Sequence, residues 1–436
     1  VPNRFDYGYG LTPEIVDLAA GKSPDLIITV DNGISSVEGV ARANKLGIEV
    51  IVTDHHLPGS QLPDAVAIVN PNQQGCDFPS KNLAGVGVAF YLLIALRTEL
   101  RQQQWFDQQQ IAEPNLSQWL DLVALGTVAD VVPLDQVNRA LVHQGLLRIR
   151  SGHSRPGIQA LLRIAGKNPA RLVATDLGFA LGPRLNAAGR LDDISLGIQC
   201  LLCDDPQQAL HTAQELDELN QDRKSIETGM QQQALAIVEQ LGLEDKSMPA
   251  ALCLFQPDWH QGVVGLLASR IKEKYHRPVV AFARGDNGEL KGSSRSIPGL
   301  HIRDALDAVA TQNPGLITKF GGHAMAAGLS LTEDKLAEFE QAFQQQVAEL
   351  ISEDDLQARL VTDGSLDAHQ LSMHTAELLR DAGPWGQQFP EPCFQGDFHI
   401  VQQRIVGEKH LKLVLAPQNQ PEIAIDAIWF NIDTAR

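Results

Sequence analysis

The chain has 436 residues, a formal net charge of −18 and a hydrophobic content of 44%. This length accommodates two or three domains with their own cores, and no apolar run approaches the roughly 20 residues that span a bilayer. The acidic balance argues against a generally basic nucleic-acid coat, although it leaves room for an enzyme with a local basic groove. No export signal is recognisable, and because the chain opens on Val1 we expect a fragment or processed form of a longer protein.

Residues 25–70 are predicted to form a βαβ unit followed by a further strand. DLIITV, IEVIVT and AVAIVNP are short apolar runs rich in β-branched residues. Ser35 or Ser36 is expected to cap a helix over VEGVARANKL that ends at Gly47. Nearly continuous apolar strands that alternate with a helix predict a buried parallel sheet.

The remaining chain predicts three further regions. A mostly helical region from Leu83 to Arg150 is expected to be interrupted by a surface loop over the glutamine-rich RQQQWFDQQQ, and residues 205–242 have the apolar spacing of one long helix. ALCLF, GVVGLLASRIKEKY and PVVAFA predict a second α/β unit, and FHIVQQRIV, HLKLVLAP and EIAIDAIWF predict antiparallel strands of a small barrel that is incomplete at Arg436. The predicted domains are a parallel-sheet α/β domain at 1–204, a connecting helix at 205–248, a second α/β domain at 249–350 and a β-rich domain at 358–436.

The cysteines form no recognisable disulfide framework, which fits a reducing cytoplasm. They are Cys76, Cys200, Cys203, Cys253 and Cys393. The CxxC spacing of Cys200 and Cys203 lies in an amphipathic apolar stretch without a second pair, so packing of a buried helix is favoured over a zinc site.

Acidic and imidazole side chains follow two neighbouring strands of the predicted sheet. Asp31 comes directly after the first strand, and Asp54, His55 and His56 come directly after the second. Because the carboxyl ends of parallel strands meet at one edge, we expect Asp31 and His55 to lie close together. Asp130 lies near the end of an apolar helical run. A negative charge is unfavourable at the carboxyl end of a helix dipole, and a nearby metal ion would explain an aspartate there.

Aspartate and histidine without thiolates suit Mn²⁺ or Mg²⁺, with some tolerance for Zn²⁺. Such ligands usually serve a two-metal site that hydrolyses phosphate esters. Each residue also has an ordinary alternative: Asp31 as a turn residue before Asn-Gly, the DHH tripeptide as a polar strand end, and Asp130 as a surface helix acid. Their joint placement favours the metal site.

The order of VDNG, VTDHH and GTVADVVPL resembles the DHH phosphoesterase superfamily. The phrases LGPRLNAAGRLDD, WHQGVVG, LKGSSRS and KFGGHAMAAG, which extend the likeness to nearly the whole chain, are similar to the RecJ family of bacterial single-strand-specific 5′→3′ exonucleases. The resemblance implies DHH, DHHA1 and OB-like domains, two Mn²⁺ or Mg²⁺ ions, and hydrolysis of single-stranded DNA with a 5′ end during DNA repair and recombination. It also implies a cytoplasmic enzyme, with a single-strand-binding protein and a helicase as candidate partners and no membrane.

The resemblance also implies roles for individual residues. Asp31, His55 and Asp130 would be metal ligands, Asp54 would orient the histidine, and His56 would touch the scissile phosphate. The implied nucleic-acid contacts are Arg184 and Asn186 at the 5′ end, with Arg190, Ser294, Arg295, Gly321, Gly322 and His323 elsewhere. The family's first motif, an Asp-x-Asp phrase with further metal-binding carboxylates, is expected before Val1, and without it the given chain is expected to lack a complete metal site.

Several of these contacts have structural alternatives. The Gly-Gly-His segment can be a packing turn, and Arg295 can be a solvated surface arginine. Arg184 and Arg190 would lie on nearly opposite faces of a helix, so we expect at least one of them on a loop or in a structural role. Trp259 is expected to pack in a core rather than to stack on a base.

Two other functions stay open at this point. One is a short-oligoribonucleotide or 3′-phosphoadenosine phosphatase of the same superfamily, and the other is a catalytically inactive subunit at replication forks. The strand-rich carboxyl-terminal region argues against the first, because a tiny substrate needs no additional barrel. The intact DHH tripeptide and Asp130 argue against the second, because a scaffold has no need of buried metal ligands.

Overall fold

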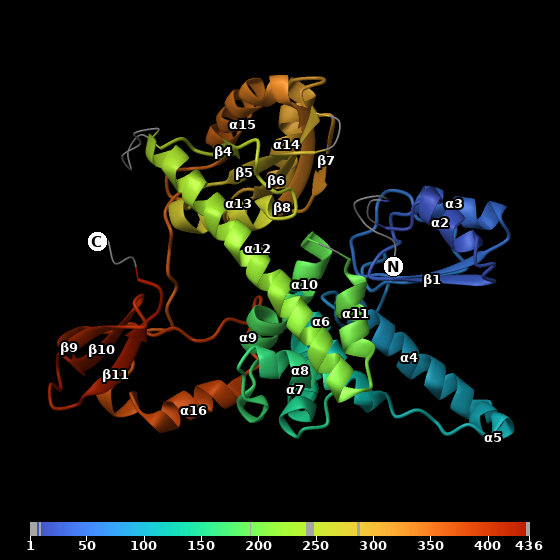
Figure 1. Cartoon of the computed structure of the whole chain (residues 1–436), viewed down its shortest axis with the longest axis horizontal. Helices are drawn as coiled ribbons and strands as arrows, with labels where there is room; N and C mark the ends of the chain where they lie inside the picture. Colours follow the sequence, from blue (N-terminus) through green and yellow to red (C-terminus); the bar gives the residue numbers. More distant parts are fainter. Residues whose placement is uncertain (1–6, 8–9, 192, 241–247, 286–287, 433–436) are drawn as a thin grey trace. The chain divides into compact units, whose positions relative to one another are not determined.

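A computed structural model describes residues 7, 10–191, 193–240, 248–285 and 288–432 (Figure 1). The chain divides into two compact units. The first contains Val1–Pro183, Cys200–Leu210 and Val361–Arg436, and the second contains Arg184–Gln199 and His211–Leu360. Among the described residues no helix is both long enough and apolar enough to span a membrane.

The first unit begins with a parallel sheet, as predicted, but its first strand is not buried as expected, because Leu26, Ile28 and Val30 are exposed. Its strands are β1 (Leu26–Val30), β2 (Glu49–Thr53) and β3 (Ala67–Val69), in that order. Val30 pairs with Thr53, so β1 and β2 end at the same level. Helices α2 (Pro13–Ala20) and α3 (Val37–Lys45) pack against the sheet through a buried core that includes Leu11, Val16, Val40, Ala43, Val50 and Val52.

The helix predicted over VEGVARANKL is α3, but its capping differs from the prediction. Ser36 occupies the N-cap position without a side-chain capping bond. Its hydroxyl oxygen instead accepts a hydrogen bond from the Leu11 N–H at 3.1 Å. Ser36 therefore fastens the chain before α2 to the start of α3. Gly47 lies just after the helix with a φ of 74°, as a residue that ends a helix often does.

Helices dominate the rest of the first unit up to residue 183. They are α4 (Gly85–Gln102), α5 (Trp105–Gln109), η1 (Leu116–Trp119), α6 (Leu120–Ala129), α7 (Gln136–Arg150), α8 (Pro156–Ile164), η2 (Pro169–Arg171), α9 (Ala174–Asp176) and the π-helical turn η3 (Leu177–Leu181). The prediction of a surface loop over RQQQWFDQQQ is wrong for most of its length, because α4 extends into it and α5 follows. The buried Phe106 anchors α5 and gives this glutamine-rich stretch a reason to be helical.

The carboxyl-terminal part of the first unit contains the predicted antiparallel strands. η6 (Ala368–Gln370) and α16 (Met373–Ala382) precede β9 (Phe398–Val406), β10 (His410–Pro417) and β11 (Ile425–Trp429), and β10 lies between the other two strands. This part contacts the α6–α7 region, since the Leu134 N–H donates to the Gln387 carbonyl at 2.8 Å. The Arg139 guanidinium also lies 3.8 Å from the centre of the Phe389 ring.

The second unit contains a mixed five-stranded sheet of order β4-β5-β6-β8-β7, in which only β4 and β5 are parallel. The strands are β4 (Leu252–Phe255), β5 (Val279–Arg284), β6 (Glu289–Arg295), β7 (Lys319–Gly322) and β8 (Ala326–Thr332). The helices are α10 (Gly182–Leu191), α11 (Ser195–Leu202), α12 (Pro206–Gln240), α13 (Val264–Tyr275), α14 (Ile302–Gln312), η5 (Glu333–Lys335) and α15 (Leu336–Leu350), and α10, α11 and α12 belong to this unit for most of their length. The predicted long helix is α12.

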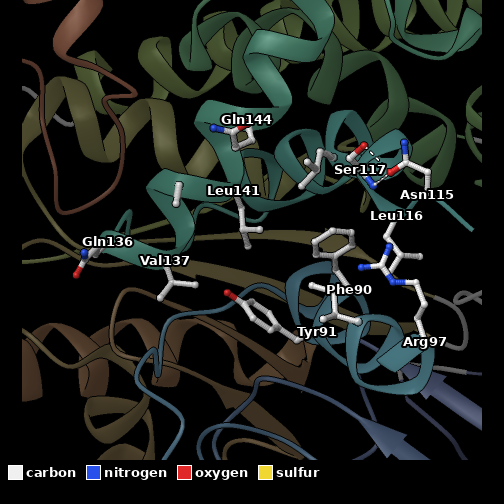
Figure 2. Close-up of a pocket in the computed structure, with 13 residues that line it drawn as sticks. Phe90, Tyr91, Arg97, Asn115, Leu116, Ser117, Gln136, Val137, Leu141 and Gln144 are labelled. Carbon is white, nitrogen blue, oxygen red and sulfur yellow. Dashed lines mark hydrogen bonds between the residues drawn. The ribbon is translucent and has the colours of Figure 1, made fainter. Parts of the chain in front are cut away.

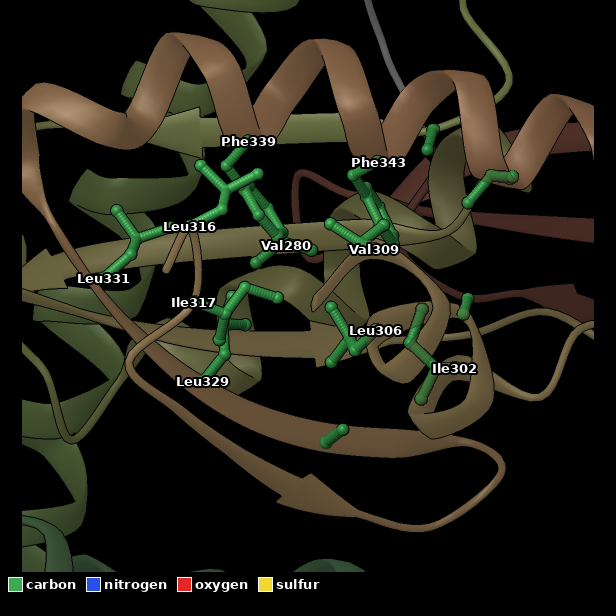
Figure 3. Close-up of a cluster of buried hydrophobic side chains, with 14 of the residues drawn as sticks. Val280, Ile302, Leu306, Val309, Leu316, Ile317, Leu329, Leu331, Phe339 and Phe343 are labelled. Carbon is green, nitrogen blue, oxygen red and sulfur yellow. The ribbon is translucent and has the colours of Figure 1, made fainter. Parts of the chain in front are cut away.

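One core of the second unit lies between its sheet and helices α14 and α15 (Figure 3). Phe282 packs edge-on against Phe339, which stacks on Phe343. Trp259 is buried in a second core with α12 and α13, and its indole N–H donates to the Gln233 side chain at 2.6 Å. The prediction that Trp259 packs in a core is therefore confirmed. All five cysteines are free, and Cys200 is fully buried at the end of α11.

Candidate metal centre

Two carboxylates and one imidazole converge at the carboxyl edge of the parallel sheet. The His55 Nε2 atom lies 3.0 Å from Asp31 Oδ1 and 3.4 Å from Asp130 Oδ2. Asp31 follows β1, His55 follows β2, and Asp130 is the C-cap residue of α6. The structure thus brings together the three side chains that the sequence predicted as ligands, from three separate elements.

The backbone around Asp31 places its carboxylate toward His55. Asp31 has a φ of 66°, in the left-handed region that aspartate and asparagine tolerate better than most residues. Its N–H continues the ladder by donating to the Thr53 carbonyl at 3.0 Å. Gly85 begins α4 directly beside this carboxylate, and a Cβ atom there would lie only 2.7 Å from Asp31 Cγ. Glycine at position 85 is therefore required for Asp31 to occupy this place, a constraint that the sequence analysis missed.

Asp130 lies in an unfavourable place for a negative charge. Burial raises its pKa, and the nearby Asp31 adds to the effect, while His55 opposes it. The next residue, Val131, has a φ of 60°, which is rare for a β-branched side chain and costs about 1–3 kcal/mol. A cation beside Asp130 and Asp31 would balance this negative charge at the end of α6.

The histidine pKa values reflect the same surroundings. Burial lowers the pKa of His55, but the hydrogen bond to Asp31 and the charges of Asp130, Asp31 and Asp54 outweigh burial and raise it. The pKa of His56 is raised chiefly by its hydrogen bond to Asp54.

The buried Asp54 side chain holds the backbone of the DHH tripeptide and the His56 ring by hydrogen bonds. It is 1% exposed, and its Oδ1 accepts hydrogen bonds from the N–H groups of His55 (2.7 Å) and His56 (3.1 Å) and from His56 Nδ1 (2.7 Å). Its Oδ2 accepts from the Ile34 N–H at 2.8 Å. Burial alone would raise the pKa of Asp54, but these hydrogen bonds outweigh it and lower the pKa. The expected orienting role thus falls on the His56 ring and not on the His55 ring, which faces Asp31 and Asp130.

Two asparagines that the sequence analysis did not single out hold the other side of the tripeptide. Asn72 Nδ2 donates to the His55 carbonyl at 2.5 Å, and Asn70 Nδ2 donates to the His56 carbonyl at 2.9 Å. Both follow β3, the third strand of the sheet. The only signal in the sequence was their position after a strand, which asparagines in ordinary turns share.

The donor set fits a hard divalent cation. Asp31, His55 and His56 each offer a ligand atom within 4.8 Å of the others, and Asp130 adds a second carboxylate next to His55. Carboxylate oxygens with one or two imidazole nitrogens and no thiolate suit Mn²⁺ or Mg²⁺.

The predicted nucleic-acid contacts on α10 have partners within the second unit. Arg184 forms an ion pair with Asp217 at 2.8 Å, and Arg190 Nη1 donates to the Gly262 carbonyl at 2.9 Å. Both arginines lie in the helix, and the structural role expected for at least one of them is seen for both. Asn186, between them, is exposed.

The predicted contacts on the sheet are less accessible than expected. Ser294 is fully buried, and its hydroxyl donates to the Ala327 carbonyl at 2.8 Å, so the structure does not present it to a ligand. Arg295 is partly buried and donates to Ser269 Oγ (3.2 Å), Ser293 Oγ (3.1 Å) and the Ser294 carbonyl (2.7 Å). Burial lowers the pKa of Arg295, and these three hydrogen bonds all go to uncharged oxygens.

The Gly-Gly-His segment forms the tight connection between β7 and β8. Gly322 has a φ of 147° and pairs with Ala327, and the His323 N–H donates to the Ala326 carbonyl at 2.8 Å. The His323 N–H is therefore already bonded to β8. Gly321, Gly322 and His323 are all exposed, so a contact through other atoms of this segment stays a prediction.

A cavity of about 560 Å³ lies elsewhere in the first unit (Figure 2). Its lining is mostly apolar and comes from α4, η1, the start of α6 and α7, and it includes Phe90, Tyr91 and Leu141. None of the residues that line it belongs to the acidic and histidine cluster, so the chemistry described above does not take place there.

Three family models match the chain. They are the DHH family N-terminal domain at residues 1–127, the DHHA1 domain at 246–349 and the RecJ OB domain at 362–435. The chain is 61% identical over 434 residues to the single-stranded-DNA-specific exonuclease RecJ of Salmonella typhimurium, and 60% identical over 435 residues to that of Escherichia coli. Each alignment covers 100% of this chain and 75% of the relative.

Solved structures agree with these sequence matches. RecJ of Thermus thermophilus in complex with Mn²⁺ has a TM-score of 0.78 and 31% identity, covering 95% of this chain and 58% of that one. The Mg²⁺ complex has a TM-score of 0.71 and 30% identity, covering 94% of this chain and 56% of that one. Both ions therefore occur in proteins whose fold this chain shares.

Proposed function

Because this chain belongs to the RecJ family of single-stranded-DNA-specific exonucleases, we propose that it hydrolyses phosphodiester bonds of single-stranded DNA from a 5′ end, with Mn²⁺ or Mg²⁺. The observation that carries the proposal is the convergence of Asp31 and Asp130 on His55 Nε2. These three side chains would hold the cation. A bound divalent ion would supply the positive charge that polarises the phosphoryl group and activates water.

Asp54 is proposed to orient His56, and His56 to bind the scissile phosphate. Asp54 fixes the His56 ring through Nδ1, and its negative charge favours the protonated imidazole, in line with the raised pKa of His56. In its protonated form this ring would attract the phosphate and donate a hydrogen bond to it. We therefore assign His56 to the scissile phosphate, as a catalytic residue distinct from the ligand His55.

Biological setting and partners follow as further parts of this proposal. A nuclease restricted to single strands depends on other proteins that unwind a duplex and cover the exposed strand, so we propose a helicase and a single-strand-binding protein as partners in DNA repair and recombination. The five free cysteines support a reducing, cytoplasmic location.

A panel of labelled substrates tests the proposal. We expect the intact protein to release nucleotides from the 5′ end of a linear single-stranded DNA in a Mn²⁺-dependent reaction, and no cleavage after chelation of the metal. A closed single-stranded circle, a duplex with blunt ends and a dinucleotide serve as comparison substrates. Rapid cleavage of the circle would contradict the requirement for an end, and preferential cleavage of the dinucleotide would favour a small-substrate phosphatase of the same superfamily.

A further inference from the structure

We propose that Asn70 and Asn72 are positioning residues that fix the directions of the two active-site imidazoles by clamping the backbone of the DHH tripeptide. The inference rests on the proposed function for its catalytic meaning. The clamp itself is visible in the contacts of the first unit.

The peptide group that joins His55 to His56 is held at both ends. Its C=O accepts from Asn72 Nδ2 at 2.5 Å, and its N–H donates to Asp54 Oδ1 at 3.1 Å. Since a peptide group is planar, two bonds at opposite ends fix the orientation of the whole plane. The direction of each adjoining Cα–Cβ bond, and hence of each ring, is then restricted.

The flanking groups extend the clamp by one peptide on each side. The His55 N–H donates to Asp54 Oδ1 at 2.7 Å, and the His56 C=O accepts from Asn70 Nδ2 at 2.9 Å. Every backbone N–H and C=O of the two histidines is therefore engaged by a side chain. The Asp54 carboxylate accepts from both backbone N–H groups, and the Asn70 and Asn72 carboxamides donate to the two backbone carbonyls.

The asparagines are themselves rigidly supported. Asn70 is 3% exposed, and its Oδ1 accepts from the Asn72 N–H at 2.8 Å, which ties the two residues together. Lys81 Nζ donates to the carbonyls of Pro71 (2.7 Å) and Cys76 (2.5 Å), on the far side of the same segment. Hydrogen bonds thus hold the segment after β3 in place, and the Asn70 and Asn72 carboxamides extend from it to the backbone of the histidines.

The bonds require a side chain that donates, which aspartate cannot do when ionised. Replacing Asn70 by Asp keeps an oxygen that can accept from the Asn72 N–H while it removes the donor to His56. Replacing Asn72 by Asp removes the donor to His55. Groups that orient a metal ligand from behind typically change metal affinity or activity by about 10–100-fold when they are lost.

The test compares N70D, N72D and N44D. Asn44 is the matched control, because its Nδ2 donates to the Asp64 carbonyl at 2.8 Å in the same unit but holds no histidine. We expect N72D to lower the affinity for Mn²⁺ about 10–100-fold by calorimetry, since Asn72 supports the ligand His55. We expect N70D to lower kcat on single-stranded DNA with little change in KM, and N44D to change neither quantity.

Two features make the outcome decisive. An added carboxylate would by its charge attract Mn²⁺, so a fall in affinity cannot be a charge effect. The imidazole ¹⁵N resonances of the metal-free protein give a readout that is independent of turnover, and we expect N70D to shift those of His56 and N72D those of His55.

Unchanged imidazole resonances in N70D and N72D would overturn the clamp, whether or not the chain is active. Effects on Mn²⁺ affinity and kcat equal to those of N44D would overturn it as well. Failure of the unsubstituted chain to bind Mn²⁺, with shifted resonances in the variants, would instead retain the clamp and count against the proposed function.

Discussion

Asp54 binds the ring of His56 and not that of His55, through a hydrogen bond of 2.7 Å between Oδ1 and Nδ1. The acid of the tripeptide therefore serves the second histidine and leaves the first to face Asp31 and Asp130. Adjacent imidazoles thus have different electrostatic surroundings, which supports the proposal that His55 binds the cation and His56 the phosphate.

We predict that H55A and D130A abolish turnover and weaken Mn²⁺ binding severely. Each substitution removes one of three donors, which should cost more than the roughly 10–100-fold typical of losing a residue that only supports a ligand. Strand binding, followed by fluorescence anisotropy, should change little, because we expect phosphate contacts elsewhere to supply most of it. H153A, which removes an exposed histidine of the same unit, is the control. Normal Mn²⁺ binding by H55A would refute the ligand assignment.

We predict that G85A lowers Mn²⁺ affinity by displacing the Asp31 carboxylate. The new Cβ would lie 2.6 Å from Asp31 Cβ, so either the side chain or the start of α4 must move. Gly229 in α12 provides the matched control, because nothing lies within 4 Å of a Cβ built there. G229A should stabilise the protein by about 0.5–1 kcal/mol through helix propensity, and it should leave Mn²⁺ binding intact. Equal Mn²⁺ affinities for G85A and the unsubstituted chain would contradict the prediction.

We predict that D54N destabilises the first unit by about 2–4 kcal/mol at neutral pH, since a buried ionised acceptor of four hydrogen bonds is replaced. The pKa of Asp54 is lowered below its ordinary value of 3.8, so its stabilising contribution is present above that value. The contribution is lost as the pH falls through the lowered pKa. Urea denaturation should therefore show a difference between D54N and the unsubstituted chain that shrinks in strong acid.

The control for D54N is D17N. Asp17 forms an exposed ion pair with Arg42 at 2.7 Å, and such pairs contribute about 0–1 kcal/mol. If D54N were no more destabilising than D17N at pH 7, the hydrogen bonds to Asp54 would not make the predicted contribution to the stability of the first unit.

We predict a diagnostic result for R295A. If Arg295 contacts a DNA phosphate, its loss should weaken binding and reduce the slope of log K against log salt by about 0.7, the value for one phosphate of a single strand. If its bonds to Ser269 and Ser293 have a purely structural role, thermal stability should fall while the salt slope stays the same. Measuring both quantities in one variant separates the two roles.

The sequence was most informative where function depends on side chains placed by regular elements. Asp31 and His55 could be paired because the ends of neighbouring parallel strands meet, and Asp130 because it ends an apolar helix. This reasoning could not identify Asn70 and Asn72, because they bond to backbone atoms, nor Gly85, because its role is to leave space for Asp31. Neither property leaves a pattern in a single sequence. The glutamine-rich stretch was misjudged because a tertiary contact of Phe106 outweighs its polar composition.

The left-handed backbone at Asp31 limits which residues a randomised library can return at that position. A φ of 66° disfavours alanine, valine and most other side chains before any question of charge arises, whereas glycine, asparagine and aspartate are accepted. If clones with bulky residues at position 31 are inactive, the cause can therefore be either misfolding or the loss of a metal ligand, and activity alone does not separate the two. Asparagine is the informative replacement, because it keeps the conformation and removes only the negative charge.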